Sequence, residues 1–318
     1  MSGGKTSNIL YAALYVANPE HIWYNIKKEG GVVLSELKFI VYDVQHGSCS
    51  HVITPANQHI IIDLGSKAET SICRYLKENY FRYGGTIDQL VLTHLHEDHI
   101  YDLPNLDTYG INPCILQRPR GAFPLSYKAS DSNHYKRIVN KANELNEHYT
   151  GVVSDSESPV LFQNNGGVHF EFFAPPDNLC SDDPNSFSNI IVVSYSYFKI
   201  VITGDNPASI LKEMLQNNIQ LRRSIKDSTI LVAPHHGRDG EYCEEFISVV
   251  NPRLTVFSDG TKKYKTQDYS RNRYANRTRG VTWGGQSRYV FTTRSDGSIK
   301  FSFRPDGTWS IDTDKFSY

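Results

Sequence analysis

The chain has 318 residues, of which 39% are hydrophobic and 21% are charged, with a formal net charge of -1. This composition is typical of a soluble globular protein, and no segment approaches the ~18 consecutive apolar residues of a membrane span. The near-neutral charge neither favours nor excludes a polyanionic partner. The five cysteines are scattered, without a C-x-x-C pair, which argues against a disulfide framework and a thiolate zinc site. The N-terminus is not typical of a secretory signal, so we expect a cytoplasmic protein.

Strands and helices are predicted to alternate from about Leu37 onward. Strands are predicted at 37–44, 59–65, 89–94, 169–175, 189–205 (a hairpin with its turn near 195–197), 228–237 and 251–260. Helices are predicted at 66–81 and 132–148, after Asn206 as N-cap with Pro207 at the first helical position, and at 241–250. The final sixty residues are predicted to form strands and turns. This order predicts a single α/β domain over 37–318, preceded by an N-terminal extension, 1–36, of unknown role.

Three of the predicted strands end in side chains that bind metals. The motifs are H-x-H-x-D-H, a Gly-Asp pair and P-H-H-G, and their candidate ligands are His94, His96, Asp98, His99, Asp205, His235 and His236. Within the first motif the spacing lets one His pair reach one ion while the following Asp-His pair reaches a second. Imidazole and carboxylate ligands without thiolate suit Zn²⁺, Mn²⁺ or Fe.

Two such ions ~3.5–4 Å apart generate a bridging hydroxide near neutral pH and stabilise the charge of an in-line displacement. The residue set therefore predicts hydrolysis, with Asp98 and Asp205 as catalytic residues. A single histidine on a strand is usually structural, but three such motifs in this order argue against coincidence.

The same motifs give the chain a family resemblance over about residues 37–304. It resembles the metallo-β-lactamase fold superfamily, and within it the hydrolase domain of ComEC-type competence proteins. Beside the ligand motifs, this resemblance is carried by 43-DVQHGS-48, 60-IIIDLG-65, 185-NSFSNIIVVSY-195, 201-VITGD-205 and 293-TRSDGSI-299. It implies a four-layer αββα sandwich of mixed sheets and two divalent transition-metal ions, with zinc or manganese favoured.

The resemblance also implies roles for single residues. His94 and His96 would hold one ion, and Asp205 would bridge to the second. Asp98 and His99 would bind that second ion together with one histidine of the His-His pair. His236 is favoured because the last ligand of the superfamily usually precedes a small residue; His235 is the alternative or an outer partner.

Other residues are implied in the surroundings of the ions. Asp63 would orient a ligand histidine, or else cap a turn at the end of its strand. The further ligand histidine found in many superfamily members has no counterpart here. Asn185 or Asn189 would complete the ligands of the first ion, or one position on that ion would stay open. Tyr101-Asp102 replaces the usual Gly-Gly, which predicts a reshaped mouth. No general acid is assigned; water, Tyr264, Lys265 and Tyr269 are the candidates.

The region from Arg253 to Arg304 holds 12 Lys and Arg against three acids, with aromatic residues interleaved. Such a composition suits phosphodiester backbones and stacked bases, or forms an ordinary solvated face. The candidate substrate-binding residues are His46, Arg238, Lys263, Tyr264 and Lys265. We therefore expect a phosphodiesterase or nuclease that acts on nucleic acid or a nucleotide. The alternatives are an ester, thioester or lactone hydrolase and a degenerate, metal-stabilised binding module.

Overall fold

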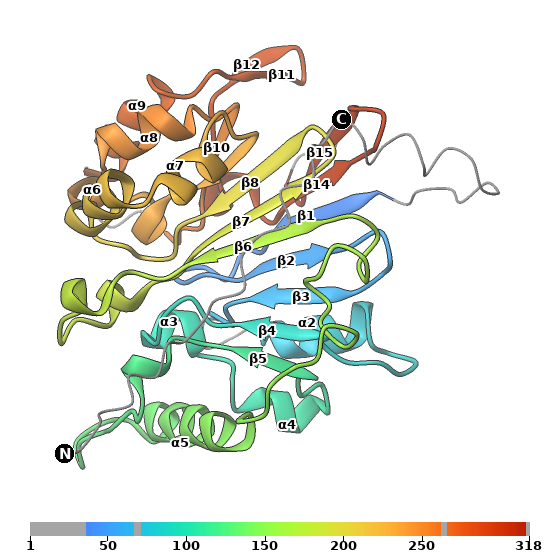
Figure 1. Ribbon diagram of the computed structural model, residues 1–318, viewed down its shortest axis with the longest axis vertical. Coiled ribbons are helices and arrows are strands. Elements are labelled where there is room, and N and C mark those ends of the chain that lie inside the picture. Colours follow the sequence, from blue (N-terminus) through green and yellow to red (C-terminus); the bar gives the residue numbers. More distant parts are fainter. Residues whose placement is uncertain (1–35, 67–70, 262–265, 316–318) are drawn as a thin grey trace, which may run out of the picture. The chain divides into compact units, whose positions relative to one another are not determined.

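The computed structural model describes residues 36–66, 71–261 and 266–315 (Figure 1). Residues from Leu34 to Tyr318 form one compact unit, to which the following description applies. The predicted extension, 1–36, lies outside the described residues except for Glu36. A search of the helices in the described residues finds none with the length and hydrophobicity that crossing a bilayer requires.

One mixed sheet has the strand order β15-β14-β1-β2-β3-β4-β5. Its strands are β1 (Leu37–Val41), β2 (Ser50–Ile53), β3 (His59–Ile62), β4 (Gln89–Val91), β5 (Ile115–Gln117), β14 (Ile299–Phe303) and β15 (Trp309–Thr313). The strands β1 to β3 form an antiparallel meander, while β3, β4 and β5 are parallel. The carboxyl ends of β3 and β4 therefore lie at the same end of the sheet.

The second mixed sheet has the order β13-β10-β9-β8-β7-β6. Its strands are β6 (His169–Phe173), β7 (Ile190–Tyr195), β8 (Phe198–Ile202), β9 (Ile230–Val232), β10 (Leu254–Phe257) and β13 (Val290–Thr292). The predicted hairpin is confirmed as β7 and β8, whereas β8, β9, β10 and β13 run parallel. A small separate hairpin pairs β11 (Val281–Trp283) with β12 (Gln286–Arg288).

Nine α-helices lie in the described residues. They are α2 (Ile72–Asn79), α3 (Glu97–Ile100), α4 (Asn105–Tyr109), α5 (Asn133–His148), α6 (Ala208–Asn217), α7 (Ile219–Ile225), α8 (Glu244–Val250), α9 (Thr266–Ala275) and α10 (Thr293–Asp296). Short 3-10 turns are η1 (Arg120–Ala122), η2 (Asp177–Leu179), η3 (Pro184–Phe187), η4 (Pro234–Gly237) and η5 (Asp239–Glu241).

The buried side chains separate into three layers of apolar packing. The middle layer fills the space between the two sheets and includes Phe39 and Val41 of β1. The neighbouring Ile40 of β1 instead faces a layer shared with α2, α4 and α5. A third layer lies between the second sheet and α6, α7 and α8. Since both sheets are covered on both faces, the predicted four-layer αββα sandwich is confirmed (Figure 1).

Two local predictions were wrong. Asn206 does not cap α6: its side-chain amide is buried and donates to the carbonyls of Ser188 and Thr203, and the helix begins after Pro207. The final sixty residues are not only strands and turns, because α9 and α10 lie among them. The sequence of α9 does not indicate a helix because it lacks an apolar stripe at helical spacing. Its large buried side chain is that of Tyr274.

A buried chain of polar rings lies on the helix-covered side of the first sheet. The hydroxyl of Tyr42 is 2.9 Å from Nδ1 of His51, and Nε2 of His51 is 3.0 Å from Nδ1 of His59. The rings of Tyr80 and Phe81 pack around the two histidines. Burial lowers the pKa of both His51 and His59, and for His51 the proximity of His59 lowers it further.

The lowered pKa values of these histidines predict that the free energy of unfolding decreases at acidic pH. Folding lowers the pKa of His51, so the unfolded chain binds a proton at this residue more readily than the folded chain. The free energy of unfolding is therefore unaffected by His51 above about pH 6.5, the ordinary pKa, and decreases as the pH falls below that value. His51→Gln should therefore flatten the dependence of the free energy of unfolding on pH, by up to about 1.4 kcal/mol per pH unit. Urea unfolding between pH 7.5 and 5 measures this slope.

The matched control is His148→Gln, which removes an exposed histidine of α5. We expect its slope to equal that of the natural protein. Equal slopes for the natural protein and His51→Gln would contradict the prediction.

Candidate metal centre

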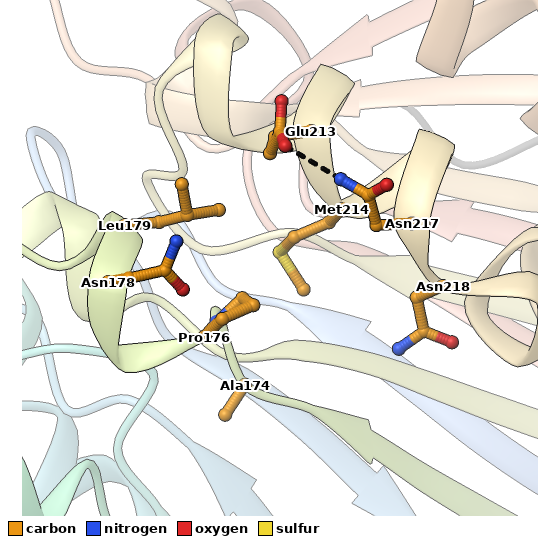
Figure 2. Close-up of a pocket in the computed structure, with 8 residues that line it drawn as sticks. All are labelled: Ala174, Pro176, Asn178, Leu179, Glu213, Met214, Asn217 and Asn218. Atoms are coloured by element: carbon orange, nitrogen blue, oxygen red, sulfur yellow. Dashed lines mark hydrogen bonds between the residues drawn. The ribbon is translucent and has the colours of Figure 1, made fainter.

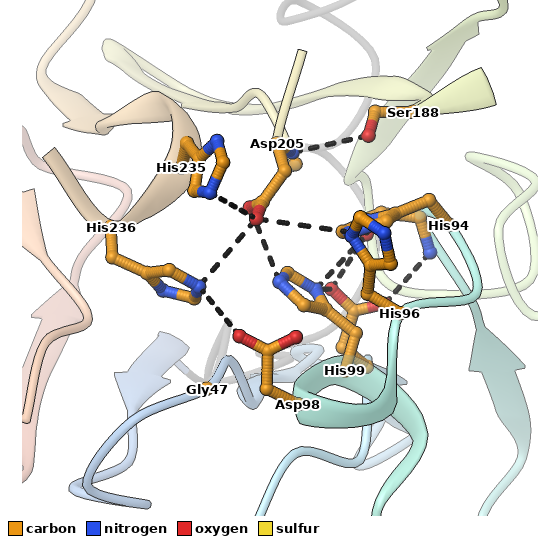
Figure 3. Close-up of polar contacts among 12 residues, drawn as sticks. Gly47, His94, His96, Asp98, His99, Ser188, Asp205, His235 and His236 are labelled. Atoms are coloured by element: carbon orange, nitrogen blue, oxygen red, sulfur yellow. Dashed lines mark hydrogen bonds and ion pairs between the residues drawn. The ribbon is translucent and has the colours of Figure 1, made fainter. Parts of the chain in front are cut away.

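The candidate ligands meet at the carboxyl ends of strands from both sheets. The motif from His94 to His99 follows β4 and runs into α3, Asp205 follows β8, and the His-His pair lies in η4 after β9. Because β8 and β9 are parallel neighbours, Asp205 and η4 emerge at the same edge. Figure 3 shows these side chains pointing toward one another, with Asp205 at the centre.

Two groups of donor atoms lie close enough to hold a metal ion. The first contains His94, His99 and Asp205, and the second contains Asp98, His99 and His236; within each, the donor atoms lie within 4.8 Å of one another. Nε2 of His99 is 3.2 Å from Oδ1 of Asp205, and Nε2 of His236 is 3.1 Å from Oδ2 of Asp98. Nε2 of His236 is also 3.5 Å from Oδ2 of Asp205, which links the two groups.

Two of the predicted ligand candidates stand outside both groups. Nε2 of His96 faces Oδ1 of Asp183 at 3.8 Å. Nε2 of His235 lies 3.8 Å from Oδ2 of Asp205, and it accepts a hydrogen bond of 3.0 Å from the guanidinium of Arg238. Of the two adjacent histidines, His236 is therefore the one whose donor atom lies with those of Asp98 and His99.

The backbone around the ligands is tightly fitted. His235 and His236 both have positive φ angles, 49° and 56°, a conformation that costs a non-glycine residue free energy and is common at functional sites. On the other side, a Cβ atom at Gly47 or Gly65 would lie 2.4 or 2.2 Å from the carbonyl oxygen of Asp98. Only glycine lets these two loops approach α3 so closely.

Three histidines present the same nitrogen to the centre. The Thr93 hydroxyl donates to Asp63, so it accepts from Nδ1 of His94 at 3.1 Å. Nδ1 of His99 donates to Asp63 at 2.7 Å, and Nδ1 of His236 donates to the carbonyl of Ser258 at 2.8 Å. With Nδ1 carrying this outward proton in each ring, Nε2 is the nitrogen left for a ligand.

Opposite charges balance one another inside the group. Burial by itself would lower the pKa of His99 and His236, but the carboxylate of Asp205, helped by Asp63 and Asp98, outweighs it and raises both. Burial would conversely raise the pKa of Asp205, yet His99 and His236 hold it well below its ordinary value. The raised pKa values of His99 and His236 favour protonated rings in the absence of metal, so metal binding is expected to release protons.

The chemistry of the donors fits a divalent transition metal. The carboxylates and imidazoles are of the types that Zn²⁺ and its neighbours bind. Nε2 of His94 is buried without a hydrogen-bond partner among the described residues. Burial, with the proximity of His99, lowers the pKa of His94, so this ring stays neutral and keeps a lone pair for a ligand. A buried, unpaired acceptor of this kind is costly unless something binds it.

The structure also places the residues predicted around the ligands. Asp63 is buried and contacts His99, as the orienting role requires, rather than only capping a turn. Asn185 and Asn189 are buried in η3 and just after it, and Oδ1 of Asn185 has no hydrogen-bond partner among the described residues. His46 is 54% exposed, with Nε2 3.7 Å from Oδ2 of Asp98, and its ring lies 5.2 Å from that of His236. Lys263, Tyr264 and Lys265 lie outside the described residues.

Tyr101 and Asp102, which replace the usual Gly-Gly, contact residues outside the ligand groups. Asp102 is buried and accepts hydrogen bonds from the Ser71 hydroxyl and the Cys73 amide at the start of α2. Tyr101 packs its ring on that of His134, with the centroids 4.1 Å apart. The carboxylate of Asp102 therefore serves the neighbouring helix and is not part of the ligand groups.

The basic region is more balanced than its composition indicates. Five of its arginines form ion pairs with carboxylates: Arg273 with Asp239, Arg277 with Glu244, Arg288 with Asp296, Arg294 with Asp259 and Arg304 with Glu36. Most of these acids lie outside the region in the sequence and join it only in the fold. The composition therefore overstates the positive charge that a substrate would meet.

A pocket of about 290 Å³ lies apart from the ligands, between α6 and the segment after β6 (Figure 2). Met214 and Leu179 line it, and the carboxylate of Glu213 is engaged by the Asn217 amide at 2.6 Å. None of the candidate metal ligands lines this pocket.

Comparison with known families agrees with this geometry. The family model of the metallo-beta-lactamase superfamily matches residues 45–167. Residues 45–167 are therefore similar to the metallo-beta-lactamase superfamily. The matched stretch includes the motif from His94 to His99 but ends before Asp205 and His236, which the structure places beside that motif. The resemblance to ComEC-type proteins stays a prediction.

No curated protein matches the chain, but several solved structures do. The metallo-beta-lactamase fold protein YhfI from Bacillus subtilis is 11% identical with a TM-score of 0.47, covering 83% of this chain and 99% of that protein. Tm1679, a metal-dependent hydrolase of the beta-lactamase superfamily, is 12% identical with a TM-score of 0.46, covering 87% and 100%. The short form of human tRNase Z is 13% identical with a TM-score of 0.37, covering 70% and 93%. Similarities this low say nothing about the substrate.

Sequence reasoning missed three contributors to the centre. Thr93 directly precedes the His94 motif, and Ser258 follows β10 in a Ser-Asp-Gly segment, but neither residue is itself of a metal-binding type. Asp183 had no signal, because it is one acid in a polar loop. All three act through contacts with a histidine that only the fold brings near.

The Asp63–His99 contact generates a prediction about metal affinity. In Asp63→Asn the carbonyl oxygen can still accept from the Thr93 amide, but the amide nitrogen then faces Nδ1 of His99 and donates to it. The ring proton must move to Nε2, which blocks the lone pair. We expect metal affinity to fall about 10- to 100-fold, the usual effect of losing such a partner, as measured by calorimetric titration with Zn²⁺.

Asp102→Asn is the control, because it neutralises another buried carboxylate that contacts no histidine of the centre. Its metal affinity should stay within about twofold of the natural protein, taking the usual scatter of such measurements. An unchanged affinity in Asp63→Asn would show that the contact does not set the tautomer of His99.

Proposed function

We propose that the protein is a metal-dependent hydrolase that cleaves phosphodiester bonds in nucleic acid or a nucleotide. The observation that carries this proposal is that two ligand groups lie side by side. They share His99, and Asp205 belongs to the first and lies close to the second. Such a set suits two adjacent ions, which when bound would activate water and stabilise the charge of a displacement reaction.

The candidate ligands would then be shared between two ions. Asp98, His99, Asp205 and His236 would hold one ion, and His94, Asp205 and His96 the other. Asp205 is proposed as the bridge because it lies near ligands of both ions: Oδ2 is near His94, assigned to one ion, while Oδ1 is near His99 and Oδ2 near His236, both assigned to the other. Its depressed pKa keeps the carboxylate ionised, as a bridging ligand must be.

The phosphodiester assignment is supported by residues beside the ligands. Arg238 follows η4 directly, and its guanidinium reaches Nε2 of His235, which itself lies 3.8 Å from Asp205. This cation can bind a phosphate oxygen next to the ions. The exposed ring of His46 has its Nε2 3.7 Å from Oδ2 of Asp98 and is proposed to contact the substrate there.

One observation favours a second function. Because five arginines of the basic region are paired with acids, the case for a polyanionic substrate depends on Arg238 and His46 rather than on that region. An uncharged ester, thioester or lactone would need neither residue. A degenerate binding module is disfavoured, since a carboxylate or imidazole fills every main ligand position.

The proposal predicts that the purified protein holds up to two transition-metal ions and cleaves bis-p-nitrophenyl phosphate. Asp205→Ala and His96→Ala should reduce cleavage to the uncatalysed background, because each removes a ligand. Elemental analysis and the colour of released nitrophenolate measure the two properties. A metal-free natural protein, or full activity in both variants, would refute the proposal.

The choice of substrate is tested by incubation with Mn²⁺ or Zn²⁺ and single-stranded DNA, duplex DNA, RNA, cyclic nucleotides or p-nitrophenyl acetate. Arg238→Ala should lower kcat/KM on phosphodiesters about 10- to 100-fold, since a hydrogen bond to a charged group contributes ~1.5–3 kcal/mol. Arg223→Ala, at an exposed position of α7, is the control. Hydrolysis of the acetate alone would favour the second function.

A further inference from the structure

His96 differs from the other histidines of the centre in how its ring is held. His94, His99 and His236 each direct Nδ1 outward to a protein partner and keep Nε2 inward. In His96 it is Nε2 that faces a protein carboxylate, Oδ1 of Asp183, at 3.8 Å, an ion-pair distance that is longer than a hydrogen bond.

Asp183 is held in place by a compact turn. Its Oδ1 accepts from the backbone amide of Asn185, as an N-cap of η3, and its own carbonyl accepts from the Ser186 hydroxyl at 2.6 Å. The carboxylate is 52% exposed, but the cap and the turn restrict the positions it can take.

The same turn forms two further hydrogen bonds with segments of the metal centre. The Ser188 hydroxyl accepts from the backbone amide of Asp205 at 3.1 Å, and the amide of Asn189 donates to the carbonyl of Thr93 at 3.1 Å. Residues 183–189 thus contact the segments that carry Asp205 and His94 as well as His96.

We propose that Asp183 is a positioning residue that orients His96 for one of the two ions. This inference rests on the proposed metal centre and deepens it. A carboxylate at Nε2 favours the tautomer with its proton on Nε2, which leaves the lone pair of Nδ1 for the metal. The negative charge also strengthens the ring as a donor. Asp183 would thus do for His96 what Asp63 does for His99.

The turn would also help to hold the first ion in the absence of the further histidine of many superfamily members. An ion bound by His94, His96 and Asp205 has few protein ligands, so its affinity depends on how well each is oriented. Fixing His96 through Asp183 lowers the entropy that metal binding must otherwise remove from an exposed ring. The ion at this position is therefore expected to be the more sensitive of the two to changes in η3.

Asp183→Asn tests the role of the charge. Asparagine caps a helical turn about as well as aspartate, so the turn should keep its structure while the carboxylate is lost. Calorimetric titration of the metal-free protein with Zn²⁺ should show one of two ions bound about 10- to 100-fold more weakly and the other unchanged. His96→Ala should weaken the same ion.

Asp182→Asn is the matched control, because it makes the same charge change at the exposed neighbouring residue and should alter neither affinity. The melting temperature of metal-free Asp183→Asn should equal that of the natural protein, whereas a purely structural role would lower it. Equal affinities in Asp183→Asn and the natural protein, or a lower melting temperature without metal, would overturn the role of Asp183.

These outcomes are separable from a failure of the proposed function. A natural protein that binds no metal at all would remove the centre itself, and Asp183 with it. A protein in which His96→Ala weakens one ion while Asp183→Asn changes neither affinity would overturn this inference alone.

Discussion

The buried carboxylate of Asp205 is the constraint around which the rest of the centre is arranged. It is 3% exposed, and a buried charge without compensation is strongly unfavourable. Nitrogens of His94, His99, His235 and His236 all lie within 4 Å of its oxygens. The left-handed backbone of the His-His pair is one result, since both rings can approach the same carboxylate only if the chain turns sharply there.

The imidazoles in turn need partners on their far sides, and these come from segments far apart in the sequence. Asp63 lies after β3, Thr93 after β4 and Ser258 after β10. Each fixes a ring by one hydrogen bond, so the position of the Nε2 atoms depends on the packing of both sheets. The fold therefore determines the tautomers as well as the distances between ligands.

Much of this could be predicted from the sequence, because the ligand motifs follow apolar strands whose ends are rigid. The geometry places His236, and not His235, beside Asp98 and His99, while the choice of His236 as the ligand stays a prediction. The contact of His96 with Asp183 could not be predicted, since it joins two distant positions through a loop without any pattern. The same limit applies to α9, which has no apolar stripe, and to the basic region, whose arginines find their acids only in three dimensions.

The strands β4 and β8 belong to different sheets, so the ligands of each group are drawn from both halves of the sandwich. An ion bound here would act as a cross-link between the two sheets, in the way that a metal clip closes a long loop. Its loss would remove attachments at one rim of the apolar interface while leaving the interface itself intact. Occupancy of the centre would then govern how readily the two sheets separate at that rim, and hence how the chain resists proteases.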